Sequence, residues 1–558
     1  MDRRFFAALG LMMLVLMGPL FFFKRPARPL TALDSTVATV GAPDSAPRPY
    51  TPGIPSPAPI GAVPQVTQAA GAPEDTVMVR SGLYEYAVST RGARLIGARL
   101  LRFRSMAADD HDGVVDLVRP GDGLFAMSLV AGGDTVRLDD VQFTPSATDL
   151  KVSGPTPLTL TGMVGGYQVE LTYTFLHDDY RVDVAGRVFG LGAGGGVLYV
   201  GLGEGIRNTE QDSVLNARDF ALVTRSPGKD PEALTFRKPD AGETRLVSGP
   251  LGWAAVKSKY FVIGAFAKDT ARRWAGAQLT RTDGAKLPHY ARMQLSMGLG
   301  ADGAFGWRTY AGPMEYPRLG AMGEEFNDVN PYGWPGFRTV MRPFALAFRA
   351  MFVWMHEHLG LAYGVVLILT GLLMRAVLWP LNQKAMRSAM EMQALQPKLQ
   401  ELQTRYKSDP AKQQQEMMRL YKEHGVNPLG GCWPMLLPMP ILLAIFFVLQ
   451  GTIELRGMPF LWFPDLSRAD PFFIIPVLSG LSMFALSKLG QRGIPPNPQA
   501  QIMTYMMPVM MTVVGFTFAS GLNLYWTASN LASLPQQWLI SQERMKRMNA
   551  TVEVKTKK

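Results

Sequence analysis

The chain has 558 residues, more than a single hydrophobic core usually supports, so we expect at least two domains. Charged residues are only 18% of the chain and mean hydropathy is +0.06, values that disfavour a wholly soluble protein. The net charge of +11 suits nucleic acid or anionic lipid, and the placement of the bases favours a membrane surface. A lone cysteine, Cys432, excludes an intrachain disulfide and is expected to be an inert apolar residue.

The first 24 residues predict a transmembrane anchor. Residues 5–23 are an uncharged apolar run, preceded by two arginines and followed by Lys24 and Arg25 without a small-x-small cleavage site. We therefore expect a retained helix rather than a removed signal peptide. Residues 25–76 contain eleven prolines among small and polar residues, a composition that cannot bury a core and predicts an extended linker.

Residues 77–320 predict an all-β domain. Apolar and polar residues alternate in four stretches, separated by Gly- and Asp-rich turns: 77–89, 166–176, 179–190 and 259–267. We expect two packed antiparallel sheets, an architecture that often binds sugars or peptides. His111, His177 and His289 stand alone without a metal-ligand spacing, so we expect no metal site in this domain.

Residues 337–355 predict an amphipathic helix. Arg338, Arg342 and Arg349 are spaced by four and seven residues, which leaves the rest of the helix surface apolar. Such a helix typically lies in the membrane interface. The alternative is a helix buried against the neighbouring transmembrane bundle.

Residues 359–541 predict the core of a polytopic α-helical membrane protein. The apolar run 359–381 has 23 residues, enough to cross roughly 30 Å of hydrocarbon. Its one charge, Arg375, costs roughly 3 to 15 kcal/mol in lipid, depending on how much water reaches it. Arg375 therefore either extends to the interface or faces a wet cavity.

Four further apolar segments follow, at about 435–451, 472–486, 503–519 and 522–540. With the N-terminal span they predict six transmembrane helices. The connection 382–428 carries eight bases against five acids, and 542–558 is a basic tail. The positive-inside rule makes both cytoplasmic, which places both termini in the cytoplasm and the β domain outside it.

The connection 382–428 predicts an antiparallel helical hairpin. Apolar residues recur at a coiled-coil spacing on the first arm and continue on the second: Leu395, Leu399, Leu402, Tyr406, Met417 and Tyr421. Ser408, Asp409 and Pro410 separate the two arms. The hairpin is either a stable connector or a docking arm for a partner or substrate.

Polar side chains within or at the ends of the spans are a further signal: Thr370, Gln383, Asn523, Tyr525, Thr527, Ser529, Asn530 and Gln536. Such groups usually face protein or water. They therefore either line a polar groove or join helices through hydrogen bonds. Methionines also concentrate in the spans, where they either fill gaps or form an adaptable surface for varied sequences.

Five stretches of the membrane half share one register: LLMRAVLWPL at 372–381, LQPKLQELQ at 395–403, 415–449 with VNPLGGC, 454–478, and SGLNLYWTASNLASLPQQWLI at 520–540. Over about residues 337–545 the chain resembles the YidC membrane protein insertases of the YidC/Oxa/Alb family. The first helix and the β domain resemble the Gram-negative form of that family, where the match rests on 252–266 and 310–313. One departure is Gly371, because the family often has a polar or aromatic residue one turn before the arginine.

The resemblance implies a five-helix insertase core and a periplasmic β-supersandwich. The implied activity is that of an insertase and chaperone for inner-membrane proteins, not an enzyme, without cofactor or metal, acting alone or with the Sec translocon. A hydrophilic groove, open to cytoplasm and lipid, would receive the polar segment of a client protein. The implied groove residues are Arg375, Thr370, Asn523, Tyr525, Trp526, Thr527 and Asn530.

The same resemblance implies a slide, along which the apolar segment of the client would enter the lipid. Its residues would be Met435, Met439, Leu443, Phe447, Met503, Met507 and Met510. The implied partners are nascent membrane proteins, the Sec translocon, the ribosome and signal recognition particle pathway, and anionic lipids, with no direct nucleic-acid contact. The implied location is the bacterial inner membrane.

Two other functions fit part of the sequence. A transporter or channel would also have several spans, but such proteins usually show paired charges and internal repeats, and neither is evident. A membrane-anchored carbohydrate-binding envelope protein would explain the β domain but not five extra spans. Proteolysis is poorly supported, because His356-Glu357-His358 is not the H-E-x-x-H motif.

Overall fold

The computed structural model describes residues 75–556, except for 111–112, 269–271, 287, 334–336, 408, 424–438 and 493–497. The predicted anchor at 1–24 and nearly all of the linker at 25–76 lie outside the described residues. The same holds for His111, Cys432, Met435 and the VNPLGGC motif.

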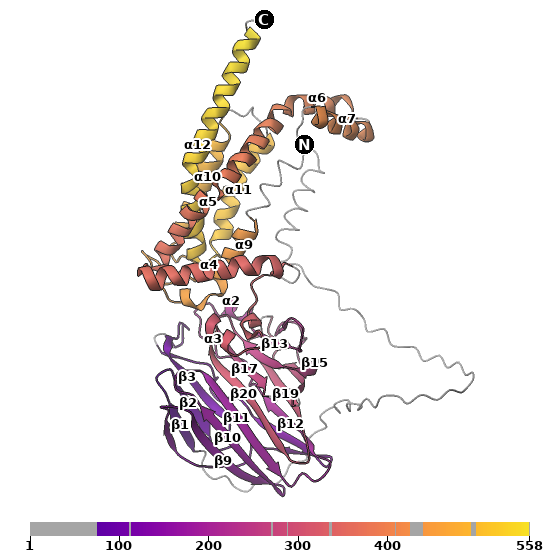
Figure 1. Cartoon of the computed structure of the whole chain (residues 1–558), viewed down its shortest axis with the longest axis vertical. Helices are drawn as coiled ribbons and strands as arrows, with labels where there is room; N and C mark the ends of the chain where they lie inside the picture. Colours follow the sequence, from indigo (N-terminus) through magenta and orange to yellow (C-terminus); the bar gives the residue numbers. More distant parts are fainter. Residues whose placement is uncertain are drawn as a thin grey trace, which may run out of the picture. The chain divides into compact units, whose positions relative to one another are not determined.

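The β domain contains three sheets rather than the two predicted (Figure 1). A five-stranded sheet has the order β4, β3, β2, β1, β8, with bounds Val114–Asp116, Leu95–Arg104, Tyr84–Ser89, Thr76–Arg80 and Asp149–Lys151. A six-stranded sheet has the order β15, β18, β19, β12, β5, β6, with bounds Thr244–Leu251, Trp274–Arg281, Ala291–Leu299, Gly196–Gly201, Met127–Ala131 and Asp134–Arg137.

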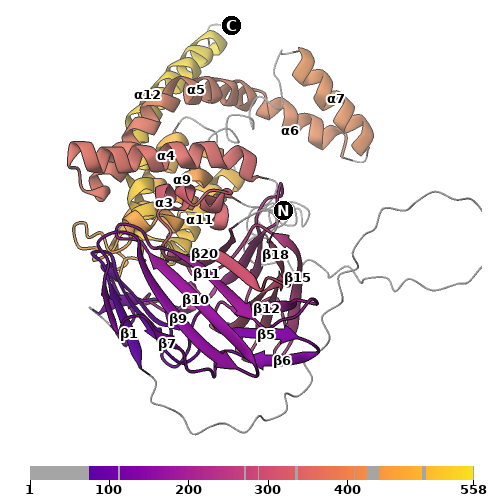
Figure 2. The same ribbon diagram turned by 60° about the horizontal axis from the view of Figure 1, so that its bottom comes forward.

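The third sheet has nine strands, and its long central strands lie side by side in Figure 2. Its order is β14, β13, β16, β17, β20, β11, β10, β9, β7, with bounds Glu232–Thr235, Ala221–Arg225, Trp253–Lys257, Phe261–Ala267, Ala304–Pro313, Arg181–Phe189, Tyr167–Phe175, Thr156–Val164 and Thr144–Pro145. The strand pairs of all three sheets are antiparallel except β1 with β8.

Local sequence explains the hairpins of this domain. Strands β9 and β10 pair Val164 with Tyr167 across Gly165 and Gly166. Both glycines have positive φ (57° and 83°), as a two-residue hairpin turn of matching twist requires. The alternating stretch 77–89 is two strands rather than one, because the Ser81 hydroxyl accepts hydrogen bonds from the backbone N–H of Leu83 and of Tyr84.

A single hydrophobic core joins the three sheets. Its largest side chains, among them Trp253, Trp274 and Trp307, are fully buried. One member of this core, Ile453, comes from the membrane half of the chain. The β domain therefore packs against a segment that lies about 140 residues after its last strand in the sequence.

The membrane half is helical. The helices are α4 Arg338–Leu359, α5 Tyr363–Ala394, α6 Gln396–Arg405, α7 Pro410–Glu423, α9 Met439–Gly451, α10 Ile474–Gly490, α11 Pro498–Gly515 and α12 Ser520–Thr556. Short helices also occur: α2 Ser213–Ala217, α3 Tyr316–Ala321, η1 Phe326–Val329 and η3 Ile453–Leu455. Of the described helices, one has a window long and apolar enough to cross a membrane, Tyr363–Pro380, and shorter apolar helices are Ile441–Gly451, Ile474–Gly490 and Thr504–Gly515.

Helix α12 occupies a central position in the bundle, packing on both α10 and α5. Helix α11 packs on α10, and α9 packs on α4, which runs crosswise to α5 and α12 in Figure 1. Glycines permit the close approaches. A Cβ on Gly371 of α5 would lie 3.2 Å from the Ser529 nitrogen and from the Tyr525 carbonyl oxygen of α12, a closeness typical of small residues between membrane helices.

Helix α4 has both buried and exposed apolar residues. Met341, Ala345 and Phe352 are buried, as a helix packed on the bundle predicts, while Val340 and Trp354 leave an exposed apolar stripe. Two of the arginines on which the amphipathic pattern rested form ion pairs. Arg349 is buried and pairs with Glu454, and Arg342 lies 3.1 Å from Asp328.

Candidate functional site

Arg375 lies on the face of α5 that packs against α12. Gly371, one turn earlier on the same face, contacts α12 near Tyr525 and Ala528. Gln536, further along α12, donates a hydrogen bond from Nε2 to the Trp379 carbonyl oxygen of α5 (3.1 Å). The two helices therefore run parallel, and Arg375 lies between these two contacts, beside the stretch of α12 that separates Ser529 from Gln536.

Two buried polar atoms at this seam lack a hydrogen-bond partner among the described residues, Arg375 Nε and Gln536 Oε1. The Arg375 side chain is half-buried, and no ion pair of Arg375 occurs within the described part of the chain. A buried donor or acceptor without a partner typically costs about 1–3 kcal/mol. A donor and an acceptor left open on neighbouring helices mark a place suited to a polar guest.

The other predicted groove residues of α12 already have partners. Asn523 donates from Nδ2 to the Gly515 carbonyl oxygen (2.9 Å), Thr527 donates to the Asn523 carbonyl oxygen (2.7 Å), and Asn530 donates to Ser482 Oγ on α10 (3.0 Å). Asn523 thus closes the turn from α11 to α12, and Asn530 joins α12 to α10. The contacts of Asn523 and Asn530 are of the kind that joins helices, whereas that of Thr527 stays within α12.

Thr370, Tyr525 and Trp526 lie close to the α5–α12 contact. Thr370 is fully buried and donates from Oγ1 to the Val366 carbonyl oxygen of its own helix (2.7 Å). Tyr525 is buried, and Trp526 is half-buried with its ring 5.7 Å from that of Phe518. Sequence reasoning placed Gln536 only among polar residues at span ends, so its open acceptor beside α5 is an addition from the structure.

The predicted slide residues fall on two helices with different neighbours. Leu443 and Phe447 of α9 and Met507 and Met510 of α11 are half-buried. Met439 and Met503 belong to the same helices, and their side chains, like Met435, lie outside the described residues. Because α9 packs mainly on α4 and α11 on α10, each helix keeps another side for a further neighbour.

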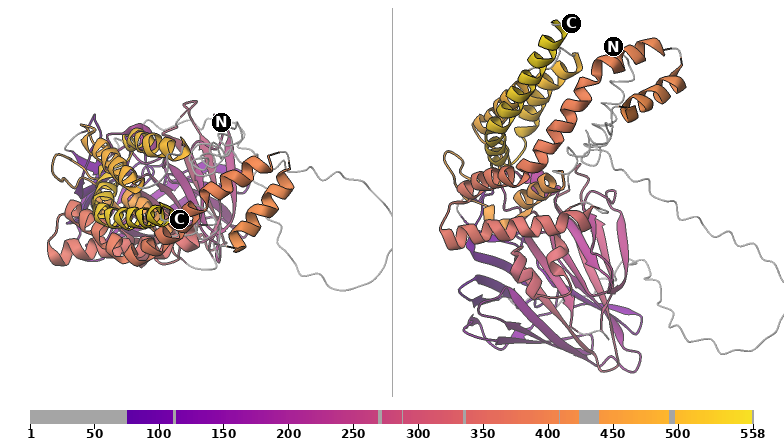
Figure 3. Two further views of the ribbon diagram at one scale, coloured as in Figure 1. Left: turned by 90° about the horizontal axis from the view of Figure 1, so that it is seen from above. Right: turned by 45° about the horizontal axis from the view of Figure 1, so that its top comes forward.

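The predicted hairpin forms as two helices, α6 and α7, which lie side by side (Figure 3). Leu395 is buried, whereas the other seam residues are half-buried: Leu399, Leu402, Tyr406, Met417 and Tyr421. A depression of about 280 Å³ between the arms is lined mostly by charges of both signs. The two arms therefore share only a thin apolar seam.

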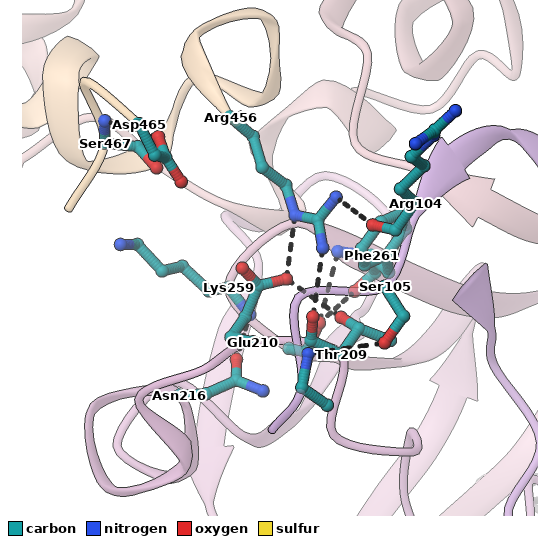
Figure 4. A network of polar contacts seen from close by, with 12 residues as sticks. Arg104, Ser105, Thr209, Glu210, Asn216, Lys259, Phe261, Arg456, Asp465 and Ser467 are labelled. Carbon is teal, nitrogen blue, oxygen red and sulfur yellow. Dashed lines mark hydrogen bonds and ion pairs between the residues drawn. The ribbon is translucent and has the colours of Figure 1, made fainter. Parts of the chain in front are cut away.

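A buried arginine that sequence reasoning missed joins the α9–α10 connection to the β domain (Figure 4). Arg456 Nε donates to Glu210 Oε1 (2.8 Å), and its terminal nitrogens donate to the carbonyl oxygens of Arg104 (2.9 Å) and Thr209 (3.0 Å). The guanidinium also lies over the ring of Phe261 at 5.2 Å. Burial raises the pKa of Glu210, while Arg456 lowers it only in part.

Profiles of two protein families match the chain. The profile described as "60Kd inner membrane protein" covers residues 354–548, and the one described as "YidC periplasmic domain" covers residues 76–346. A relative from Ralstonia nicotianae, named membrane protein insertase YidC, is 31% identical across 93% of this chain and 92% of its own length. The chain belongs to the YidC family of membrane protein insertases.

Other proteins named YidC are also similar to this chain. The protein of that name from Chlorobaculum tepidum is 29% identical over 92% of this chain and 87% of its own length. Among solved structures, the chain is similar to "Active YidC insertase crystal structure with the first transmembrane domain resolved", with 18% identity, 83% of this chain and 94% of that chain covered, and a TM-score of 0.34. Family membership decides against the transporter, channel and anchored carbohydrate-binding alternatives.

The YidC family is not one of enzymes, and its fold combines a helical insertase core with a periplasmic β domain. Within the described ranges, no group of three His, Cys, Asp or Glu side chains is placed to hold a metal ion. His356, one of the residues in the sequence His-Glu-His, stacks on Tyr363 at 4.2 Å and contacts the Leu361 carbonyl oxygen at 2.8 Å through Nδ1.

Proposed function

We propose that this protein inserts nascent proteins into the bacterial inner membrane by receiving their polar segment beside Arg375. The observation that carries the proposal is the pair of open, buried polar atoms at the α5–α12 seam, Arg375 Nε and Gln536 Oε1. A guanidinium presents five donors, so it suits carboxylate and carbonyl oxygens of a polypeptide.

The proposed mechanism lowers the free energy needed to move the polar groups of a client protein across the bilayer. Moving an unpaired polar group from water into hydrocarbon costs several kcal/mol, and a charged side chain costs still more. A hydrated groove that reaches part-way across the bilayer shortens the apolar distance that such groups must cross. The apolar segment of the client then leaves sideways along α9 and α11, where Leu443, Phe447, Met507 and Met510 offer adaptable side chains.

The proposed topology has six transmembrane helices, counting residues 5–23, with both termini in the cytoplasm. The domains are an anchor at 1–24, a linker at 25–76, a periplasmic β domain at 77–320, an interfacial helix at 337–355, a core at 359–541 that contains the cytoplasmic hairpin 382–428, and a basic tail at 542–558. The charge distribution of the connections supports this orientation. The proposed partners are nascent membrane proteins, the Sec translocon, the ribosome and signal recognition particle pathway, and anionic lipids.

Site-specific photocrosslinking tests the groove. A photoreactive amino acid replaces Gln536 or Arg375 in turn, and a ribosome-stalled client presents its polar segment to membranes that contain the variant. We expect crosslinks from both positions to that segment. Val377 and Leu539 are exposed positions on the same two helices and serve as matched controls. Equal crosslinking from all four positions, or none from the two seam positions, would contradict the groove.

A further inference from the structure

A groove of about 660 Å³ runs between α10 and α12. Its walls are mainly apolar, with two bases at one end; the lining residues are Phe484, Ala485, Lys488, Leu489, Arg492, Leu531, Leu534, Pro535 and Trp538. It differs from the seam at Arg375, which lies between α12 and α5. The groove presents an apolar channel with a positively charged end.

The positive end has little to neutralise it. Of the described lining residues none is acidic, and Glu543 is the only acid in the sequence from 484 to 546. Lys488 Nζ lies 3.2 Å from the Tyr505 hydroxyl, a neutral partner, and Arg492 is exposed. The site is thus complementary to a single anionic group.

A third cation is fixed close to this end. Arg544 of α12 donates from one terminal nitrogen to the carbonyl oxygens of Gly490 (2.7 Å) and Arg492 (3.2 Å), at the end of α10. Arg544 is 7% exposed, and its Nε is buried without a hydrogen-bond partner among the described residues. Arg544 therefore occupies the carbonyl groups that would otherwise repel an anion, and it adds positive charge beside Arg492.

The apolar part of the groove suits a hydrocarbon chain. Leu531 and Trp538 are exposed along α12, and Phe484 and Ala485 continue the surface on α10. Trp and Lys side chains at one level are typical of a membrane–water boundary. In the topology of the proposed function, on which this step rests, that level is the cytoplasmic one, since Lys488 and Arg492 follow the predicted span 472–486.

We propose that this groove binds one anionic phospholipid of the cytoplasmic leaflet. The phosphate lies between Lys488 and Arg492, and an acyl chain lies along Phe484, Leu531 and Leu534. Basic pockets between membrane helices on the cytoplasmic side are typical sites for anionic headgroups. The occupant is a lipid rather than a client helix, because the groove ends in paired cations suited to one phosphate group.

Native mass spectrometry of the full-length protein, released from nanodiscs of phosphatidylglycerol and phosphatidylethanolamine, tests the site. We expect retained phosphatidylglycerol on the wild type, and about a tenfold loss in K488Q/R492Q, since each base contributes to holding an anionic headgroup. The matched control is R405Q/K407Q, which removes the same charge from exposed positions of the hairpin and should retain the lipid. Equal loss in both double variants would show a general charge effect and overturn the site.

A second variant, A485W, keeps both cations and fills the apolar channel. We expect it also to displace phosphatidylglycerol, whereas unchanged retention would overturn the acyl-chain placement. A photoreactive group at Leu531 that captures a client helix instead of lipid would likewise overturn the proposal. Lipid retention is measured without insertion activity, so an inactive protein that still binds the lipid would count against the insertion proposal alone.

Discussion

At the scale of single residues, two residues of α5 determine the contact with α12. Gly371 has no side chain to keep the helices apart, and Arg375 carries a charge that is unfavourable in lipid. Gly371 lets α12 approach, and Arg375 stands one turn later on the same face. The absence of a side chain at Gly371, which departs from the family pattern, therefore has a packing reason. The two residues call for different tests, one of function and one of stability.

Replacing Arg375 with Ala should reduce insertion of clients whose translocated segment is acidic by about tenfold, since ~1.4 kcal/mol of attraction lost in a partly wet cavity has that effect. Clients with neutral segments should be affected far less. Protease protection of the translocated segment in reconstituted vesicles measures both. Arg375→Lys retains the charge and should recover most of the loss; equal defects for acidic and neutral clients would make Arg375 a structural residue.

Replacing Gly371 with Val should destabilise the bundle by about 1–3 kcal/mol, because the added atoms meet the backbone of α12, which cannot move aside as a flexible side chain can. Thermal unfolding of the detergent-solubilised protein measures this change. Gly320→Ala, at a position where a Cβ meets nothing within 4 Å, is the control. If both variants unfold at the wild-type temperature, α5 and α12 do not approach as closely as described.

At the scale of elements, periodicity predicts an element better than it predicts its partner. Strand β10 lies at Tyr167–Phe175 within the predicted 166–176, and β17 at Phe261–Ala267 within 259–267, because alternation depends only on the strand itself. The third sheet was missed because pairing is non-local, as in β1 with β8. For the same reason Arg375 could be predicted from one apolar run, whereas the open acceptor of Gln536 needed the register of α12 against α5.

The hairpin gives an element-scale prediction. None of the side chains of α7, all of which the structure describes, is buried, and the arms contact mainly each other. Replacing residues 398–422 with a short Gly-Ser linker should therefore leave the thermal unfolding of the rest of the protein within about 2 °C of the wild type. Insertion should nevertheless be lost if the hairpin docks a partner. Full activity in the linker variant, measured by protease protection, would make the hairpin a connector.

At the scale of the whole molecule, the β domain and the helical half are joined by more than the chain that connects them. Ile453 enters the β-domain core, and Arg456 forms its ion pair with Glu210, a residue 246 positions earlier. Neither role could be predicted from the sequence. The chain has many Arg and Glu residues, and only the folded structure shows which two of them pair. The connection between α9 and α10 is thereby held on the β domain.

Replacing Arg456 should destabilise the protein more than replacing Glu210 does. Arg456→Ala removes all three hydrogen bonds and leaves Glu210 buried without its counter-charge, which typically costs about 3–5 kcal/mol. Glu210→Gln keeps an acceptor for the Arg456 guanidinium and should cost much less. Limited trypsin cleavage near Arg338, between the two halves, measures the release of the β domain and should accelerate at least tenfold in Arg456→Ala. Arg468→Ala, in the same connection, is the control and should be cleaved at the wild-type rate.

The pH dependence of this contact follows from Glu210. Its pKa is raised by burial, so the folded protein binds the proton more tightly than the unfolded chain does, and this group stabilises the fold progressively as pH falls through its folded pKa. That contribution is lost again as pH rises. The difference in thermal unfolding temperature between wild type and Glu210→Gln should therefore shift in favour of the wild type from pH 7 to pH 5, because the variant cannot take up this proton. A shift in the opposite direction would mean that the attraction of Arg456 outweighs burial and that the ionised pair is the stable form of the contact.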